Sequence, residues 1–159
     1  MGAVKRGLPS PIPLARLVAL AYRQLIDELH VRLEAEGYAD VRPAFGYVLL
    51  ALRKQQTTAV DIALLLGVTK QATSKLIDAM EHGGCVRRQR HGDDARAKTI
   101  AISAKGREVL VTVESIYRDL EAEWADVTSK KRVEALRADL RTIVEAAHGM
   151  QLPAVRPTR

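Results

Sequence analysis

The chain is 159 residues long, has a formal net charge of +6, and is 47% hydrophobic but only 4% aromatic. This length favours one compact domain. A core so poor in aromatic rings must consist mainly of Leu, Val, Ile and Ala, which suits helix packing better than a β-sandwich. The single cysteine excludes an intrachain disulfide framework and a cysteine-based zinc site.

The basic balance of the chain indicates an anionic partner, either nucleic acid or a membrane surface. The sequence has no run of about 18 apolar residues that would span a bilayer. Its opening residues, 1–13, lack the uninterrupted apolar stretch of a secretory signal. We therefore expect a soluble cytoplasmic protein that does not enter a membrane.

The first part of the chain predicts three helices. Residues 14–37 and 43–54 each place apolar side chains three and four positions apart, the first run ending at a glycine and the second beginning with a proline. A third helix follows a threonine cap, Thr57 or Thr58, and ends at Gly67. The expected inner face of this third helix is Val60, Ile62, Ala63 and Leu66.

Residues 68–107 concentrate the positive charge of the chain. They contain nine basic and four acidic side chains and so hold +5 of the net +6. A helix-sized run begins at its cap, Thr69, and ends at a Gly-Gly pair. Two strand-like runs, 86–89 and 99–102, can then pair as a hairpin around a loop of about eight residues. A helix-turn-helix followed by a basic hairpin is the arrangement that a DNA-reading surface needs.

Two further amphipathic helices follow the hairpin. Ser103 is the expected cap of the first and Thr128 of the second, which should end at Gly149. These two helices and the N-terminal one have apolar stripes but no part in reading DNA. They therefore predict a dimerisation lobe.

The predicted fold class is mainly α with a small β-hairpin wing: a winged helix-turn-helix plus a helical dimerisation lobe. We expect a single domain over residues 1–159. The dimerisation lobe comprises 10–37 and 103–148, the DNA-binding lobe comprises 43–102, and the flexible tails are 1–9 and 149–159.

Four short segments together resemble the MarR family of winged-helix transcriptional regulators. They are GVTKQATSKLID from Gly67, GCVRR from Gly84, DARAK from Asp94 and ISAKG from Ile102, where Ile-Ser replaces the usual Leu-Thr. The resemblance covers residues 14–147 and implies a single MarR-like domain that binds double-stranded DNA as a homodimer on a pseudo-palindrome, more often as a repressor. It also implies a small aromatic or other small-molecule effector that binds between the lobes and releases the DNA.

The candidate DNA contacts lie on the 69–83 helix and on the hairpin. Gln71 can pair with adenine, and Lys70 or Lys75 can reach guanine or phosphate. The alternative, a merely solvated polar face, is disfavoured by the neighbouring basic hairpin. Thr73 is among the candidates, although its helical spacing turns it inward. The predicted DNA-binding residues are Thr69, Lys70, Gln71, Thr73, Ser74, Lys75, Arg87, Arg88, Arg90, Arg96 and Lys98.

Arg96 lies at the expected tip of the wing, where an arginine can enter a narrow A·T-rich minor groove. Asp94 would be repelled by phosphate, so its expected role is to orient the Arg96 guanidinium through a bidentate pair. Two roles stay open for Arg88: a contact with a phosphate, or a structural salt bridge beneath the wing.

Other residues allow functional interpretations that we do not favour. Cys85 can be a redox sensor or a buried packing residue, and its place directly after the glycines favours burial. His30 and Glu34 are four residues apart on one helix, but two ligands do not make a metal site. The aromatic residues that can either line an effector cleft or fill the core are Tyr22, Phe45, Tyr47 and Trp124.

No phosphate loop, paired catalytic carboxylates or nucleophile-base arrangement stands out in the sequence. We therefore predict no metal, no cofactor and no enzymatic activity. The alternative to a transcriptional regulator is an architectural DNA-binding protein that needs no effector.

Overall fold

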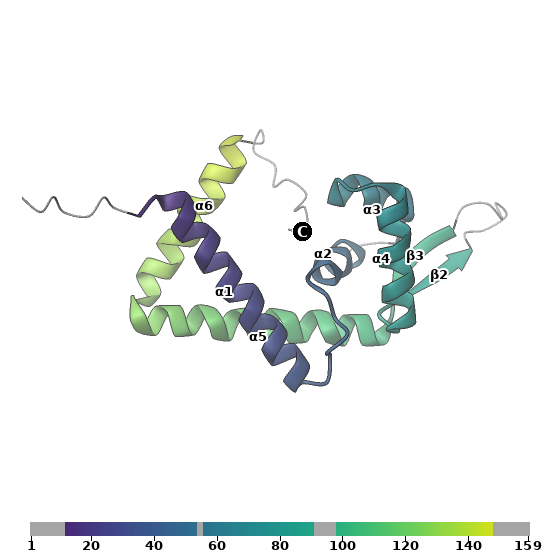
Figure 1. Cartoon of the computed structure of the whole chain (residues 1–159), viewed down its shortest axis with the longest axis horizontal. Helices are drawn as coiled ribbons and strands as arrows, with labels where there is room; N and C mark the ends of the chain where they lie inside the picture. Colours follow the sequence, from purple (N-terminus) through teal and green to yellow (C-terminus); the bar gives the residue numbers. More distant parts are fainter. Residues whose placement is uncertain (1–11, 54–55, 91–97, 148–159) are drawn as a thin grey trace, which may run out of the picture.

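The computed structural model describes residues 12–53, 56–90 and 98–147 (Figure 1). Within these ranges the chain forms α-helices and three short β-strands, arranged as two lobes along a long helix, α5 (Figure 1). The mainly α fold with a β-hairpin is thus confirmed. The helices are α1 (Leu14–Ala35), α2 (Pro43–Leu52), α3 (Ala59–Leu66), α4 (Lys70–His82), α5 (Ala104–Val127) and α6 (Lys130–Ala147). The strands are β1 (Thr57–Thr58), β2 (Val86–Arg90) and β3 (Lys98–Ile102).

Helices α1 and α6 lie along one part of α5, and α2, α3, α4 and the sheet lie toward its N-terminal end (Figure 1). The core runs through both groups. Its largest fully buried side chains include Leu33 of α1, Phe45 of α2, Ile62 of α3 and Val109 of α5. Helix α5 therefore connects the two lobes through one continuous apolar core.

Local signals set the helix-turn-helix formed by α3 and α4. Thr58 and Asp61 form a reciprocal capping box at the start of α3, which selects Thr58 of the two predicted caps. Gly67 ends α3 with a φ of 61°, in the left-handed region that favours glycine. Two residues later the Thr69 hydroxyl accepts a hydrogen bond from the Ala72 amide at 3.2 Å, so α4 begins directly after this tight turn.

The strands form an antiparallel sheet in the order β1-β3-β2. Pairing of β2 with β3 runs from Val86 opposite Ile102 to Arg90 opposite Lys98, which confirms the predicted hairpin. Strand β1, which pairs with the other side of β3, was not predicted. A two-residue strand is too short to show the alternation by which a sequence reveals a strand. In this sheet β2 is an edge strand.

Two predicted details of α2 and α3 are wrong. Val60 does not face the core: it is 47% exposed, because Ile62 and Leu66 define a buried side of α3 from which Val60 points away. Helix α2 ends at Leu52, two residues before the predicted end.

Thr128 does not cap α6, contrary to the prediction. It ends α5 instead, and its hydroxyl donates a hydrogen bond to the Trp124 carbonyl at 2.7 Å. The Ser129 hydroxyl accepts the Arg132 amide at 3.2 Å and so supplies the cap of α6. The predicted stop at Gly149 and the predicted tails 1–9 and 149–159 lie outside the described residues.

Candidate DNA-binding surface

Helix α4 has one buried side and one polar side. Ile77 and Met80 are fully buried and fix the helix on the core. Five of the predicted DNA-binding side chains are exposed on its N-terminal half, where the helix also has free amide groups that favour phosphate. These five residues are Thr69, Lys70, Gln71, Ser74 and Lys75, and we call them the α4 polar face.

Thr73 does not belong to the α4 polar face, so its inclusion among the DNA contacts is wrong. Its side chain is completely buried, and its hydroxyl donates to the Thr69 carbonyl at 3.1 Å within the helix. This bond satisfies the buried hydroxyl and leaves no route to DNA. The inward spacing of Thr73 was already visible in the sequence.

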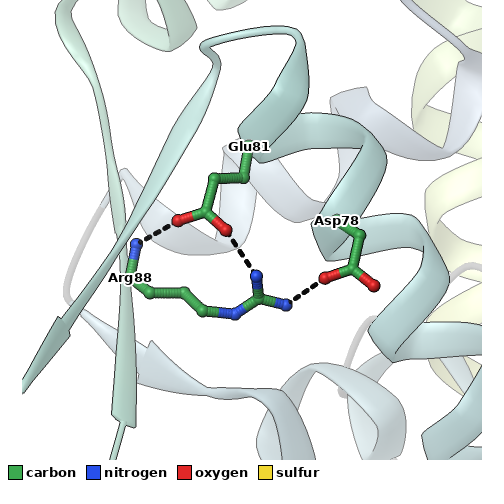
Figure 2. A network of polar contacts seen from close by, with 3 residues as sticks. All are labelled: Asp78, Glu81 and Arg88. Carbon is green, nitrogen blue, oxygen red and sulfur yellow. Dashed lines mark hydrogen bonds and ion pairs between the residues drawn. The ribbon is translucent and has the colours of Figure 1, made fainter.

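Arg88 is engaged by two carboxylates of α4, as Figure 2 shows. Its guanidinium donates to Asp78 at 2.5 Å and also to Glu81, and its backbone amide donates to Glu81 at 3.1 Å. The hydrogen bond to Asp78, followed by the charge of Glu81, raises the pKa of Arg88 despite partial burial. Of the two open roles, the structural salt bridge is therefore the one that the structure shows.

The remaining wing residues are described in part. Arg87 of β2 and Lys98 of β3 are exposed, as a phosphate contact requires. Arg90 lies opposite Lys98 at the outer end of the hairpin, but the placement of its side chain falls outside the described part of the chain. Arg96 and Asp94 are in the segment 91–97, which also lies outside the described residues.

Cys85 is a buried packing residue, as the sequence favours. Its side chain is 1% exposed, and burial raises the pKa of its thiol, an effect that the charge of Lys105 partly opposes. In the described ranges, no group of three or more His, Cys, Asp or Glu side chains is placed to hold a metal ion. No helix in those ranges is long and apolar enough to cross a membrane.

A cavity of about 160 Å³ lies between α1, α2 and α5, where the two lobes meet. Tyr47 lines this cavity and its hydroxyl pairs with that of Tyr22 at 3.2 Å, whereas Phe45 is core. Burial, and then the bond to Tyr22, raises the pKa of Tyr47. His30 also lines the cavity, and its buried Nε2 has no hydrogen-bond partner in the described structure. Trp124 lies elsewhere, at two other hollows beside α1.

Several polar contacts between elements were not predicted from the sequence, and three of them bear on the proposed site or the cavity. They are the pair of acids on α4 that hold Arg88, the Tyr22–Tyr47 bond between α1 and α2, and the ion pair between Arg53 and Glu114. A signal existed only for the first, because Asp78 and Glu81 are three residues apart on one helix face and the strand that follows carries arginines. The other two join residues that are distant in sequence.

A helix, a glycine turn, a second helix and an antiparallel hairpin define a winged helix-turn-helix protein. Residues 39–97 match the family model described as MarR family. This match covers α3, α4 and β2, and it agrees with the sequence resemblance to this family of winged-helix transcriptional regulators.

Known proteins of similar sequence or structure include transcriptional regulators. The HTH-type transcriptional regulator BilQ of Clostridioides difficile is 25% identical over 107 residues, which cover 64% of this chain and 72% of the relative. The transcriptional regulator BldR from Sulfolobus solfataricus has 28% identity and a TM-score of 0.63, with 84% of this chain and 93% of that chain covered. A MepR variant from S. aureus, solved bound to an oligodeoxyribonucleotide, has 22% identity and a TM-score of 0.60, with 86% and 99% covered.

Proposed function

We propose that the chain is a transcriptional regulator that binds specific double-stranded DNA through the α4 polar face. The observation that carries this proposal is the division of α4 into a side locked in the core and an exposed side of donors and acceptors. A helix of 13 residues is about 20 Å long, and the major groove that it would enter is about 12 Å wide. In that groove Gln71 can pair with adenine, while Lys70 and Lys75 reach guanine or phosphate. The oligonucleotide bound to the MepR relative supports the same use of the fold.

The wing completes the proposed interface. Arg87, Arg90 and Lys98 contact phosphates on either side of the groove, and Arg96 enters the adjacent minor groove with Asp94 as its orienting partner. The recognition helix then discriminates bases, and the wing mostly positions the protein. This division follows from side-chain chemistry. The four wing residues are long cations that suit phosphate, and none of them carries the paired donor and acceptor that read adenine.

We also propose that the regulator is a homodimer. Helix α6 has no buried residue within the single chain, and its exposed apolar side chains Leu136, Leu140 and Ile143 belong to the same lobe as exposed Leu14 and Leu17 of α1. Apolar faces of this kind mark interfaces. A second copy related by a two-fold axis would cover them and set two α4 helices about one DNA turn apart.

The dimer is tested by sedimentation of a Leu140→Glu variant. We expect it to sediment as a monomer, because a charge would be placed inside the interface. Leu64→Glu is the matched control, since Leu64 is 76% exposed but lies on α3, away from α1 and α6. A dimeric Leu140→Glu variant would contradict the proposed interface.

The regulator is further proposed to act as a cytoplasmic, nucleoid-associated repressor that a small molecule releases. The cavity between the lobes supports this idea, because about 160 Å³ is close to the volume that holds a single aromatic ring. The unpartnered Nε2 of His30 offers one polar contact to such a ligand. A ligand that binds better when the lobes are in a DNA-incompetent arrangement would weaken DNA binding by a typical coupling of about 1–3 kcal/mol.

Filling the cavity tests the effector separately from DNA binding. Gly46 lines the cavity, and a Cβ at this position would meet no atom within 4 Å. We expect Gly46→Leu to bind DNA like the wild type but to lose any response to single-ring aromatic compounds that dissociate the wild-type complex. An unchanged response would move the effector to another site.

The central proposal is tested by selection from a pool of random-sequence duplexes, followed by competition. We expect the wild-type protein to enrich a pseudo-palindromic duplex and to prefer it to the unselected pool by at least about 10³-fold. An architectural DNA-binding protein would instead bind both with equal affinity. Salt dependence alone does not distinguish the two, because both release counterions.

A further inference from the structure

Arg88 joins the wing to the recognition helix through both its side chain and its backbone. The guanidinium of Arg88 donates to Asp78 and to Glu81, which lie about one turn apart on α4, while its backbone amide donates to the second carboxylate oxygen of Glu81 (Figure 2). Main chain and side chain of one strand residue are therefore both fixed to the same helix. The two carboxylates are three residues apart, which places them side by side on the helix face that meets β2.

The position of β2 at the edge of the sheet explains the role of the hydrogen bond that the Arg88 backbone amide donates. Strand β2 pairs only with β3, so amides on its outer edge have no strand partner within the sheet. The Arg88 amide is one of them, and it donates to Glu81 rather than to a strand. This bond ties the free edge of the hairpin to α4 and fixes the direction in which the hairpin leaves the helix.

The same contacts also offset negative charge on α4. Asp78 and Glu81 lie in the second half of the helix that we propose enters the major groove, where two uncompensated carboxylates would repel phosphate. The Arg88 guanidinium lies against both of them and offsets part of their charge. Its side chain is 31% exposed, which is consistent with a group held between two elements.

We infer that Arg88 is a positioning residue for DNA recognition: it sets the wing against α4 and neutralises Asp78 and Glu81, and it does not itself contact DNA. The inference rests on the proposed function. It predicts that Asp78 and Glu81 contribute to DNA affinity although they are negatively charged, because each holds Arg88 in place.

A double-mutant cycle tests this role with the duplex that the wild-type protein selects from a random-sequence pool. Arg88→Ala should weaken binding by about tenfold. In an Asp78→Asn, Glu81→Gln background the same change should weaken binding by less than about threefold, because Arg88 has no partners left to act through. Equal losses in the two backgrounds would overturn the inference, since a direct DNA contact is independent of the acids.

Arg87→Ala is the matched control, because Arg87 is the neighbouring residue of the same strand and is exposed. As a phosphate contact it should weaken binding equally in both backgrounds and lower the salt-dependence slope by about one. Failure of the wild-type protein to select any duplex would instead contradict the proposed function, so the two failures are distinguishable.

Sequence preference provides the readout that a merely stabilising residue would not change. Selection with Arg88→Ala should retain the base preferences read by α4 but lose those at the flanking positions beneath the wing. Arg88→Lys, which keeps the charge but cannot reach two carboxylates with a planar fork, should recover only part of the affinity. An Arg88→Ala variant that selects the wild-type sequence in full would overturn the inference.

Discussion

Gly106, in the first turn of α5, packs directly against the backbone carbonyl of Cys85, the residue immediately before β2. A Cβ at Gly106 would lie 2.0 Å from that oxygen, which is a collision with main chain rather than with a movable side chain. The same oxygen accepts the Ser103 amide at 3.1 Å, and the Ser103 hydroxyl accepts the Gly106 amide at 2.9 Å. The last glycine of the ISAKG segment is thus required by close packing where the hairpin meets α5.

Gly106→Ala should therefore destabilise the fold by about 3 kcal/mol, at the upper end of the usual effect of overpacking. Chemical denaturation followed by circular dichroism measures the change. Gly46→Ala is the matched control: its added methyl meets nothing within 4 Å, so it should stabilise α2 by about 0.5–1 kcal/mol. A Gly106→Ala protein as stable as the wild type would show that the junction between β2 and α5 can open without penalty.

Cys85 should make stability depend on pH in the alkaline range. Burial raises the pKa of its thiol in the folded state, so the folded state holds the proton more tightly than the unfolded chain. The resulting stabilisation is complete below the unfolded pKa of about 8.5 and is lost as the pH rises above it toward the folded value.

The measurement is the unfolding free energy of the wild type and of Cys85→Val between pH 7 and pH 10. The wild type should lose stability relative to Cys85→Val as the pH rises above about 8.5, and the difference should be constant below that pH. Parallel curves over the whole range would contradict a buried thiol. The folded wild type should also react slowly with a thiol-alkylating reagent at neutral pH.

Arg96→Ala should weaken binding to the selected duplex by about 1–3 kcal/mol while leaving the protein folded and dimeric. The physical reason is that a guanidinium in a narrow minor groove gains from the strong negative potential there. Affinity is measured by fluorescence anisotropy, and folding by thermal denaturation. Unchanged affinity would mean that the tip of the wing does not touch DNA.

Much of the fold could be predicted because its signals are local. Gly67 ends α3, Thr69 caps α4, and the β-branched run at the end of the hairpin forms β3, each within a few residues of its cause. The error at the start of α6 arose because two neighbouring residues offer equivalent chemistry. Thr128 and Ser129 both carry a hydroxyl suited to a cap, and only the path of the chain decides between them.

The candidate site was predictable to the extent that it depends on helical spacing. The exposure of Lys70, Gln71 and Lys75 follows from the inward positions of Ile77 and Met80 on the same helix. The role of Arg88 could not be decided in that way. It depends on which side of β2 faces α4, and pairing between separate elements is a property of the tertiary fold.

The most direct measurement for the DNA-recognition proposal is binding of the wild type and Gln71→Ala to the selected duplex and to versions in which each adenine is replaced in turn. We predict that one replacement weakens wild-type binding by about 1–3 kcal/mol and has no further effect on Gln71→Ala, because the bidentate pair is already lost. Gln24→Ala, a change at an exposed glutamine of α1, should leave every affinity unchanged. If Gln71→Ala instead binds all the duplexes as the wild type does, α4 does not read adenine through Gln71 and the proposed mode of recognition is wrong.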